Sequence, residues 1–169
     1  MIQQNSKIDD SEDVARMISS EWIVDGILQQ TAFMLNPKET YLSVNRPCVD
    51  SYEEDVSKFV SNHERFRFEN DSYKRALLSV LDVRSIKVYN DSEELLNVNI
   101  EVEARNVHTK SHAGIFVRSG STNIIPERQL PEEVASKHVS VDMVLQDIRW
   151  ELLELAELQE CKITEGKQE

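Results

Sequence analysis

The chain contains 169 residues, of which 40% are hydrophobic and 30% are charged, with only four glycines and four prolines. This composition is typical of one globular domain that buries its own core, and it excludes a low-complexity or fibrous chain. The net charge of −12 disfavours non-specific binding to nucleic acid and to anionic membranes. A local basic face remains open, because residues 56–126 carry ten bases against nine acids while both ends of the chain are acidic.

The cellular location is predicted from two features of the sequence. No apolar run reaches about 18 residues, the length that crosses a membrane, and the first seven residues lack the basic and apolar blocks of a secretory leader. Cys48 and Cys161 lie far apart and form no disulfide framework. We therefore expect a cytoplasmic protein without membrane association, in which both cysteines are free thiols.

The first predicted element is a helix. Ser11 is followed by two acids, which is typical of a helix start, and apolar residues then recur at helical spacing as far as Gly26. Residues 32–35 and 41–45 are predicted to be short strands, because the residues between them have the composition of a turn.

A second helix and an interrupted strand are predicted next. Ser51 and Glu54 have the spacing of a capping box, which predicts a helix that begins there. Residues 76–89 are rich in Leu and Val, but their apolar positions change parity near 84–85. A strand cannot absorb such a shift, so we expect a bulge or a break at that point, with a helix over 73–81 as the competing interpretation.

The clearest strand signal lies at 98–104, where apolar and polar residues alternate. A loop containing two histidines follows, then a strand over 113–117 and a turn at 119–122. The alternation predicts a sheet with one buried face and one solvent-exposed face. The histidine loop would lie at its edge.

The last third of the chain is predicted to be helical after Pro131, which suits a first helical position. Its apolar stripe is broad and is centred on Val141, Leu145, Ile148, Leu152 and Leu155. We predict an α+β domain over 1–160, in which a mainly antiparallel sheet from the middle of the chain is covered by this long C-terminal helix and by smaller N-terminal helices. Residues 161–169 are predicted to be a loose polar tail.

Burial of this stripe against the alternating strand is the most specific structural expectation. The strand and the helix carry the two largest apolar surfaces available to each other. We therefore expect one shared core that contains Ile100, Val102, Leu145, Ile148 and Leu152.

His108 and His112 are the only close histidine pair. Their spacing of four suits zinc on a helix, but the local pattern is strand or loop, and a catalytic zinc site needs a third protein ligand. His63, His138, Glu101 or Glu103 would supply it only if the fold brought them there. Surface histidines bonded to the backbone, or one histidine acting as acid or base, are the better-supported alternatives, so no metal is predicted.

Basic residues surround this loop in the sequence. Arg105 and Arg118 bracket the histidines and would hold a phosphate or carboxylate if they converged. The alternative, which we favour, is that these arginines form the exposed face of the sheet and pair with nearby acids. No phosphate loop, dinucleotide fingerprint, nucleophile elbow or CxxC motif is present, so no cofactor is predicted.

Four short segments resemble a pattern found in small bacterial proteins without an assigned activity. They are Ala32 and Phe33, then Glu39, the run Leu-Ser-Val-Asn-Arg at 42–46, and the run His-Ala-Gly-Ile at 112–115. The resemblance implies a bacterial origin, and it implies that the polar members of the pattern face one another: Glu39, Ser43, Asn45, Arg46 and His112.

Two functions follow as hypotheses. The first is an accessory or regulatory module that binds a partner protein through acidic helices, with a row of acids at spacing three: Glu151, Glu154, Glu157 and Glu160. The second is a small enzyme or ligand-binding protein for an anionic, nucleotide-like ligand. In it, His108 or His112 acts as acid or base, and the ligand is held by Ser43, Asn45, Arg46, Arg105 and Arg118. The oligomeric state does not follow from either.

Overall fold

The computed structural model describes residues 6–35, 38–105, 109–125 and 127–164. Its main element is an antiparallel sheet in the strand order β1-β7-β8-β5-β2-β6-β10, with β9 added beside β8. A separate hairpin pairs β3 with β4. The strands are β1 Ser6–Lys7, β2 Asp13–Ile18, β3 Ile23–Val24, β4 Ile27–Leu28, β5 Leu42–Asn45, β6 Ser72–Ser79, β7 Asn99–Ala104, β8 His112–Ser119, β9 Thr122–Asn123 and β10 Glu157–Lys162.

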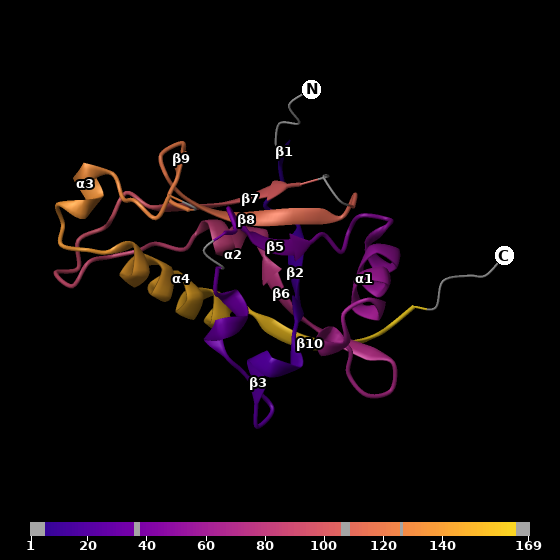
Figure 1. The fold of residues 1–169 in the computed structure, drawn as a ribbon. Coiled ribbons are helices and arrows are strands. Elements are labelled where there is room, and N and C mark those ends of the chain that lie inside the picture. Colours follow the sequence, from indigo (N-terminus) through magenta and orange to yellow (C-terminus); the bar gives the residue numbers. More distant parts are fainter. Residues whose placement is uncertain (1–5, 36–37, 106–108, 126, 165–169) are drawn as a thin grey trace.

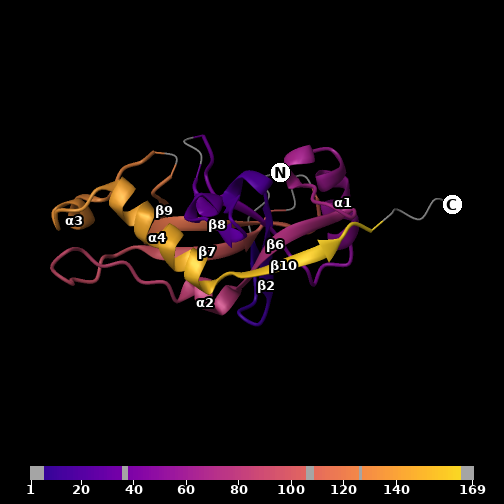
Figure 2. The ribbon, with the colours of Figure 1, turned by 90° about the horizontal axis from the view of Figure 1, so that it is seen from below.

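The two longest helices lie over different parts of this sheet (Figures 1 and 2). The helices are α1 Tyr52–Ser61, α2 Val80–Arg84, α3 Glu132–Ala135 and α4 Val141–Leu155, together with 3₁₀ turns at Ser20–Trp22, Gln30–Phe33 and Glu64–Phe66. The structure is therefore α+β with a mainly antiparallel sheet and a C-terminal helix of 15 residues. None of the described helices has the length and apolar character needed to cross a membrane.

The two faces of the sheet bury two separate hydrophobic clusters. The larger cluster lies under α4 and contains the inward-facing residues of β7 and β8. In β7 these residues alternate with polar ones, as the sequence predicts. The smaller cluster lies under α1 and includes Val56, Val60 and Tyr73. On the second face, β7 presents Asn99, Glu101 and Glu103, which alternate with its buried residues.

The expectation of a shared core is confirmed. Five residues are buried in the larger cluster: Ile100, Val102, Leu145, Ile148 and Leu152. Cys48 and Cys161 are free, as predicted.

The predicted N-terminal helix is wrong, because Asp13–Ile18 forms strand β2. This strand pairs with β5 on one side and β6 on the other. Val14 and Ile18 enter the larger cluster while Ala15 and Met17 enter the smaller one. A strand buried on both faces has apolar residues at consecutive positions, and such a run imitates helical spacing.

Three further boundaries differ from the expectations. Gln30–Phe33 forms a 3₁₀ turn, so no strand begins at residue 32. The break expected near 84–85 begins earlier, because β6 ends at Ser79. The short helix α2 follows and is capped by the Ser79 hydroxyl. Strand β10 pairs with β6 through Cys161 and Lys162, so these two residues belong to the sheet and not to a loose tail.

Candidate functional site

His112 begins strand β8, where β5 and β7 flank it. It lies opposite Asn45 of β5, and its carbonyl accepts a hydrogen bond of 2.8 Å from the backbone N–H of Arg105. The imidazole Nε2 lies 3.2 Å from the Tyr41 hydroxyl. The structure therefore brings Arg105 and His112 together, whereas His108 lies outside the described residues.

Tyr41 organises this corner of the sheet, and sequence reasoning did not single it out. Its ring meets the edge of His112 at a centroid distance of 5.8 Å and lies against Phe116 at 5.1 Å. The guanidinium carbon of Arg105 lies 5.1 Å from the centre of the same ring, which is within cation–π range. Gly114 provides the space for the ring, because a β-carbon there would lie 2.5 Å from Tyr41 Cδ2.

The other two arginines of the predicted ligand site are bound by carboxylates. Arg118 donates to both oxygens of Glu103, at 2.6 and 2.8 Å, and to Asn123. Arg46 donates to both oxygens of Glu12 at 2.9 Å. Such bidentate pairs are the strong form of the arginine–carboxylate interaction, and they match the alternative in which arginines pair with acids on the sheet surface.

Asn45 and Ser43, two further members of the resemblance, are hydrogen-bonded to different neighbours. Asn45 donates to the hydroxyl of Ser111, which itself donates to Asp55 of α1, so this network ties the start of β8 to the helix. Ser43 is exposed, and its carbonyl accepts a hydrogen bond from Arg16. Arg16 is partly buried, and desolvation lowers the pKa of its guanidinium to about 10.

The described residues bear on two kinds of chemistry, metal binding and nucleophilic attack by a thiol. Among the described residues, no three His, Cys, Asp or Glu side chains lie close enough to hold a metal ion. The thiol of Cys48 lies 2.9 Å from Glu12, and this hydrogen bond raises the pKa of the thiol above its ordinary value. A raised pKa reduces the thiolate fraction, which is the reverse of what a nucleophilic cysteine requires.

The Glu12–Arg46 pair leads to a prediction about acid stability. Hydrogen bonds from Arg46, opposed by partial burial and assisted by Cys48, lower the pKa of Glu12. The carboxylate is therefore ionised at lower pH in the folded chain than in the unfolded chain, where its pKa is about 4.3. The stability it contributes is fully present above that pH and is lost as the pH falls through the lowered pKa.

Glu12→Gln should therefore unfold more easily than the wild type at pH 6, and the difference in the free energy of unfolding should shrink below about pH 4. Urea denaturation from pH 3 to pH 7 measures it. Glu133→Gln, at an exposed position of α3, is the matched control and should follow the wild type. A constant difference across the whole range would contradict the prediction.

The outward face of α4 is acidic and carries a large aromatic side chain. The stripe Met143, Asp147, Trp150 and Glu154 follows helical spacing, and every member is exposed. Trp150 keeps 50% of its surface accessible. The helix contains four acids and a single base, Arg149. The predicted row of four acids on one helix is wrong, because α4 ends at Leu155 and its last two members, Glu157 and Glu160, lie on β10.

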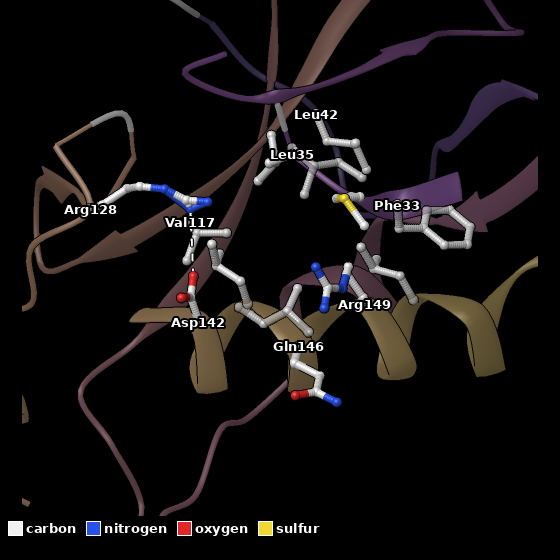
Figure 3. Close-up of a pocket in the computed structure, with 13 residues that line it drawn as sticks. Phe33, Leu35, Leu42, Val117, Arg128, Asp142, Gln146 and Arg149 are labelled. Carbon is white, nitrogen blue, oxygen red and sulfur yellow. Dashed lines mark ion pairs between the residues drawn. The ribbon is translucent and has the colours of Figure 1, made fainter. Parts of the chain in front are cut away.

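The inward face of α4 encloses a cavity of about 250 Å³ (Figure 3). Leu42, Ile115 and Val117 of the sheet line one side of it. The helix contributes a second apolar wall, and residues 33–35 contribute a third. Figure 3 shows Arg128 and Asp142 at the rim, joined by an ion pair of 3.6 Å, while Arg149 rises from the helix between the walls.

Arg149 has an unusual environment within the described part of the chain. Its Nε atom is buried and has no hydrogen-bond partner there. Leaving a buried donor unsatisfied costs about 1–3 kcal/mol, and more for a charged group. The sequence contains one signal of this arrangement, because Arg149 follows Ile148 on the same inward side of the helix as Leu145 and Leu152.

In comparisons with known proteins, no family model, no curated protein and no solved structure matches this chain.

Proposed function

We propose that this chain is an acidic cytoplasmic module that binds a basic segment of a partner protein on the outward face of α4. The observation that carries the proposal is Trp150, half exposed among carboxylates on a helix whose other side contributes Leu145, Ile148 and Leu152 to the larger hydrophobic cluster. Tryptophan is strongly enriched among the residues that dominate binding energy at protein interfaces.

The chemistry of this surface defines the partner. Asp142, Asp147, Glu151 and Glu154 leave α4 with an excess of negative charge. They attract lysine and arginine side chains and accelerate encounter with a basic segment. An arginine can also stack on the indole ring of Trp150. A second copy of this chain is a poor occupant, because an isologous contact through this face would bring like charges together.

The alternative of an anionic ligand beside the histidines has one observation in its favour, namely that Arg105 and His112 both border the Tyr41 ring. It ranks second because Arg46 and Arg118 are already held by carboxylates.

A charge-reversal experiment tests the proposed surface. The probe is a synthetic amphipathic peptide with lysines and leucines at helical spacing, titrated at moderate salt while the emission of Trp150 is followed in a Trp22→Phe background. Reversal of Asp147, Glu151 and Glu154 to lysine should weaken binding roughly 3- to 100-fold, because each of the three lost contacts with a cation costs a few tenths to about 1 kcal/mol.

The control carries the same change in net charge elsewhere. Glu54, Glu64 and Glu69 are exposed residues on and beside α1, and their reversal to lysine should reduce affinity only slightly. Trp150→Ala should also weaken binding, measured by calorimetry. If both triple variants lose affinity equally, the peptide responds only to net charge and the proposed surface is wrong.

A further inference from the structure

The cavity beneath α4 has the features of a small-molecule site that is separate from the outward face. Ligand pockets are mainly apolar with a few placed polar groups, and they range from about 300 to 1,000 Å³. This cavity, at about 250 Å³, lies just below that range, which restricts it to a small ligand. Its walls are mainly apolar, and the polar residues that line it are Arg128, Asp142, Gln146 and Arg149. Figure 3 shows the amide of Gln146 pointing away from the other lining side chains.

The charged residues around the cavity restrict the charge of the ligand. Arg128 is paired with Asp142 at the rim, whereas Arg149 takes part in none of the ion pairs formed by the described residues. One uncompensated guanidinium matches one negative charge. A phosphate monoester would bring nearly two charges close to Asp142 in a protein of net charge −12, so a dianion is disfavoured.

We propose that this cavity binds a small monocarboxylate with an apolar body, such as a medium-length aliphatic acid, whose carboxylate pairs with Arg149. The guanidinium offers a planar fork of donors that matches a carboxylate. The carboxylate would satisfy the buried Nε, which finds no acceptor within the described residues. The aliphatic body would lie against Leu42, Ile115 and Val117, where it loses its contact with water.

The test compares acids with neutral molecules of the same shape. Butanoate, hexanoate, octanoate and phenylacetate are titrated by calorimetry and by thermal shift, with hexanamide as the neutral match for hexanoate. We expect hexanoate to raise the melting temperature and hexanamide to have little effect, since ligands stabilise the state that they bind. Equal effects of the two would overturn the proposal, because they would show that Arg149 does not recognise the charge.

Substitutions in the cavity provide the second part of the test. Arg149→Met should weaken hexanoate binding roughly 10- to 100-fold, the range for loss of a charged hydrogen bond. Without ligand, the same variant should melt no lower than the wild type, because methionine removes the unsatisfied donor and retains the apolar stem. Arg65→Met, at an exposed arginine near α1, is the matched control. Wild-type affinity in Arg149→Met would overturn the proposal.

Leu145→Phe provides an independent check should Arg149→Met not fold. The larger ring fills part of the cavity and leaves Arg149 in place, so hexanoate binding should be lost while butanoate binding is retained more fully. Unchanged binding of both acids would place the ligand elsewhere and overturn the proposal. The reversal of Asp147, Glu151 and Glu154 should leave hexanoate binding within a few-fold of the wild type, so the two proposals can fail separately.

Discussion

Truncation of Leu152 to alanine is expected to lower the free energy of unfolding by about 2–5 kcal/mol. Leu152 is 2% exposed and lies in the larger core cluster, on the inward face of α4. The change removes buried methyl groups and enlarges a cavity that already exists beneath the helix. Its neighbours cannot close the new space fully, because α4 is held at both ends, by the Ser140 cap and by the start of β10.

Urea denaturation followed by far-UV circular dichroism measures this effect. Glu151→Ala changes the adjacent residue on the exposed side of the same helix and should alter stability by no more than about 0.5 kcal/mol. A loss below about 1 kcal/mol for Leu152→Ala would mean that α4 does not dock on the sheet, and the core described above would be wrong.

The elements that the sequence predicts well are those with one buried and one exposed face. Strand β7 and helix α4 each separate apolar from polar residues, with a period of 2 in the strand and 3.6 in the helix. Their periods therefore identify both the type of element and the side that is buried. The same separation correctly predicts that Ile100 and Ile148 share one core.

The element that fails lacks this separation. Strand β2 lies in the interior of the sheet, and both its faces are covered, one by the cluster under α4 and the other by the cluster under α1. Its apolar residues therefore carry no period of two. The serine and acids before it resemble a helix start, but local propensity is outweighed by the pairing of β2 with β5 and β6.

The candidate sites also depend on contacts that the sequence alone does not reveal. Arg105 and His112 are seven residues apart in the sequence, and in the structure the backbone N–H of Arg105 donates to the carbonyl of His112. The sequence does not reveal that Arg46 is held by Glu12, since 34 residues separate the two in the chain. It also does not reveal the cavity, whose walls come from β5, β8, α4 and residues 33–35. Contacts between such distant segments depend on topology, which a single local pattern does not encode.

Replacement of Gly114 by alanine tests the position of the Tyr41 ring. It should lower the free energy of unfolding by about 1–3 kcal/mol, the usual range for overpacking. The new β-carbon would lie 2.5 Å from Tyr41 Cδ2, 2.8 Å from Tyr41 Cγ and 3.0 Å from Phe116 Cε2. The first two atoms are at the base of the ring, so relief requires the whole side chain to move. Thermal or urea denaturation measures the loss.

A double-mutant cycle separates this clash from other effects of the substitution. Tyr41→Ala removes the ring, so Gly114→Ala should cost much less in that background, with a coupling energy of about 0.5–3 kcal/mol. Gly120→Ala is the contrast, because no atom lies within 4 Å of its β-carbon position and its φ is +61°. Its cost comes from the left-handed backbone, so it should be unaffected by Tyr41→Ala. Additive losses for Gly114→Ala and Tyr41→Ala would show that the ring does not lie over Gly114. The contacts of Tyr41 with His112 and Arg105 would then have to be reassigned, since both depend on the position of that ring.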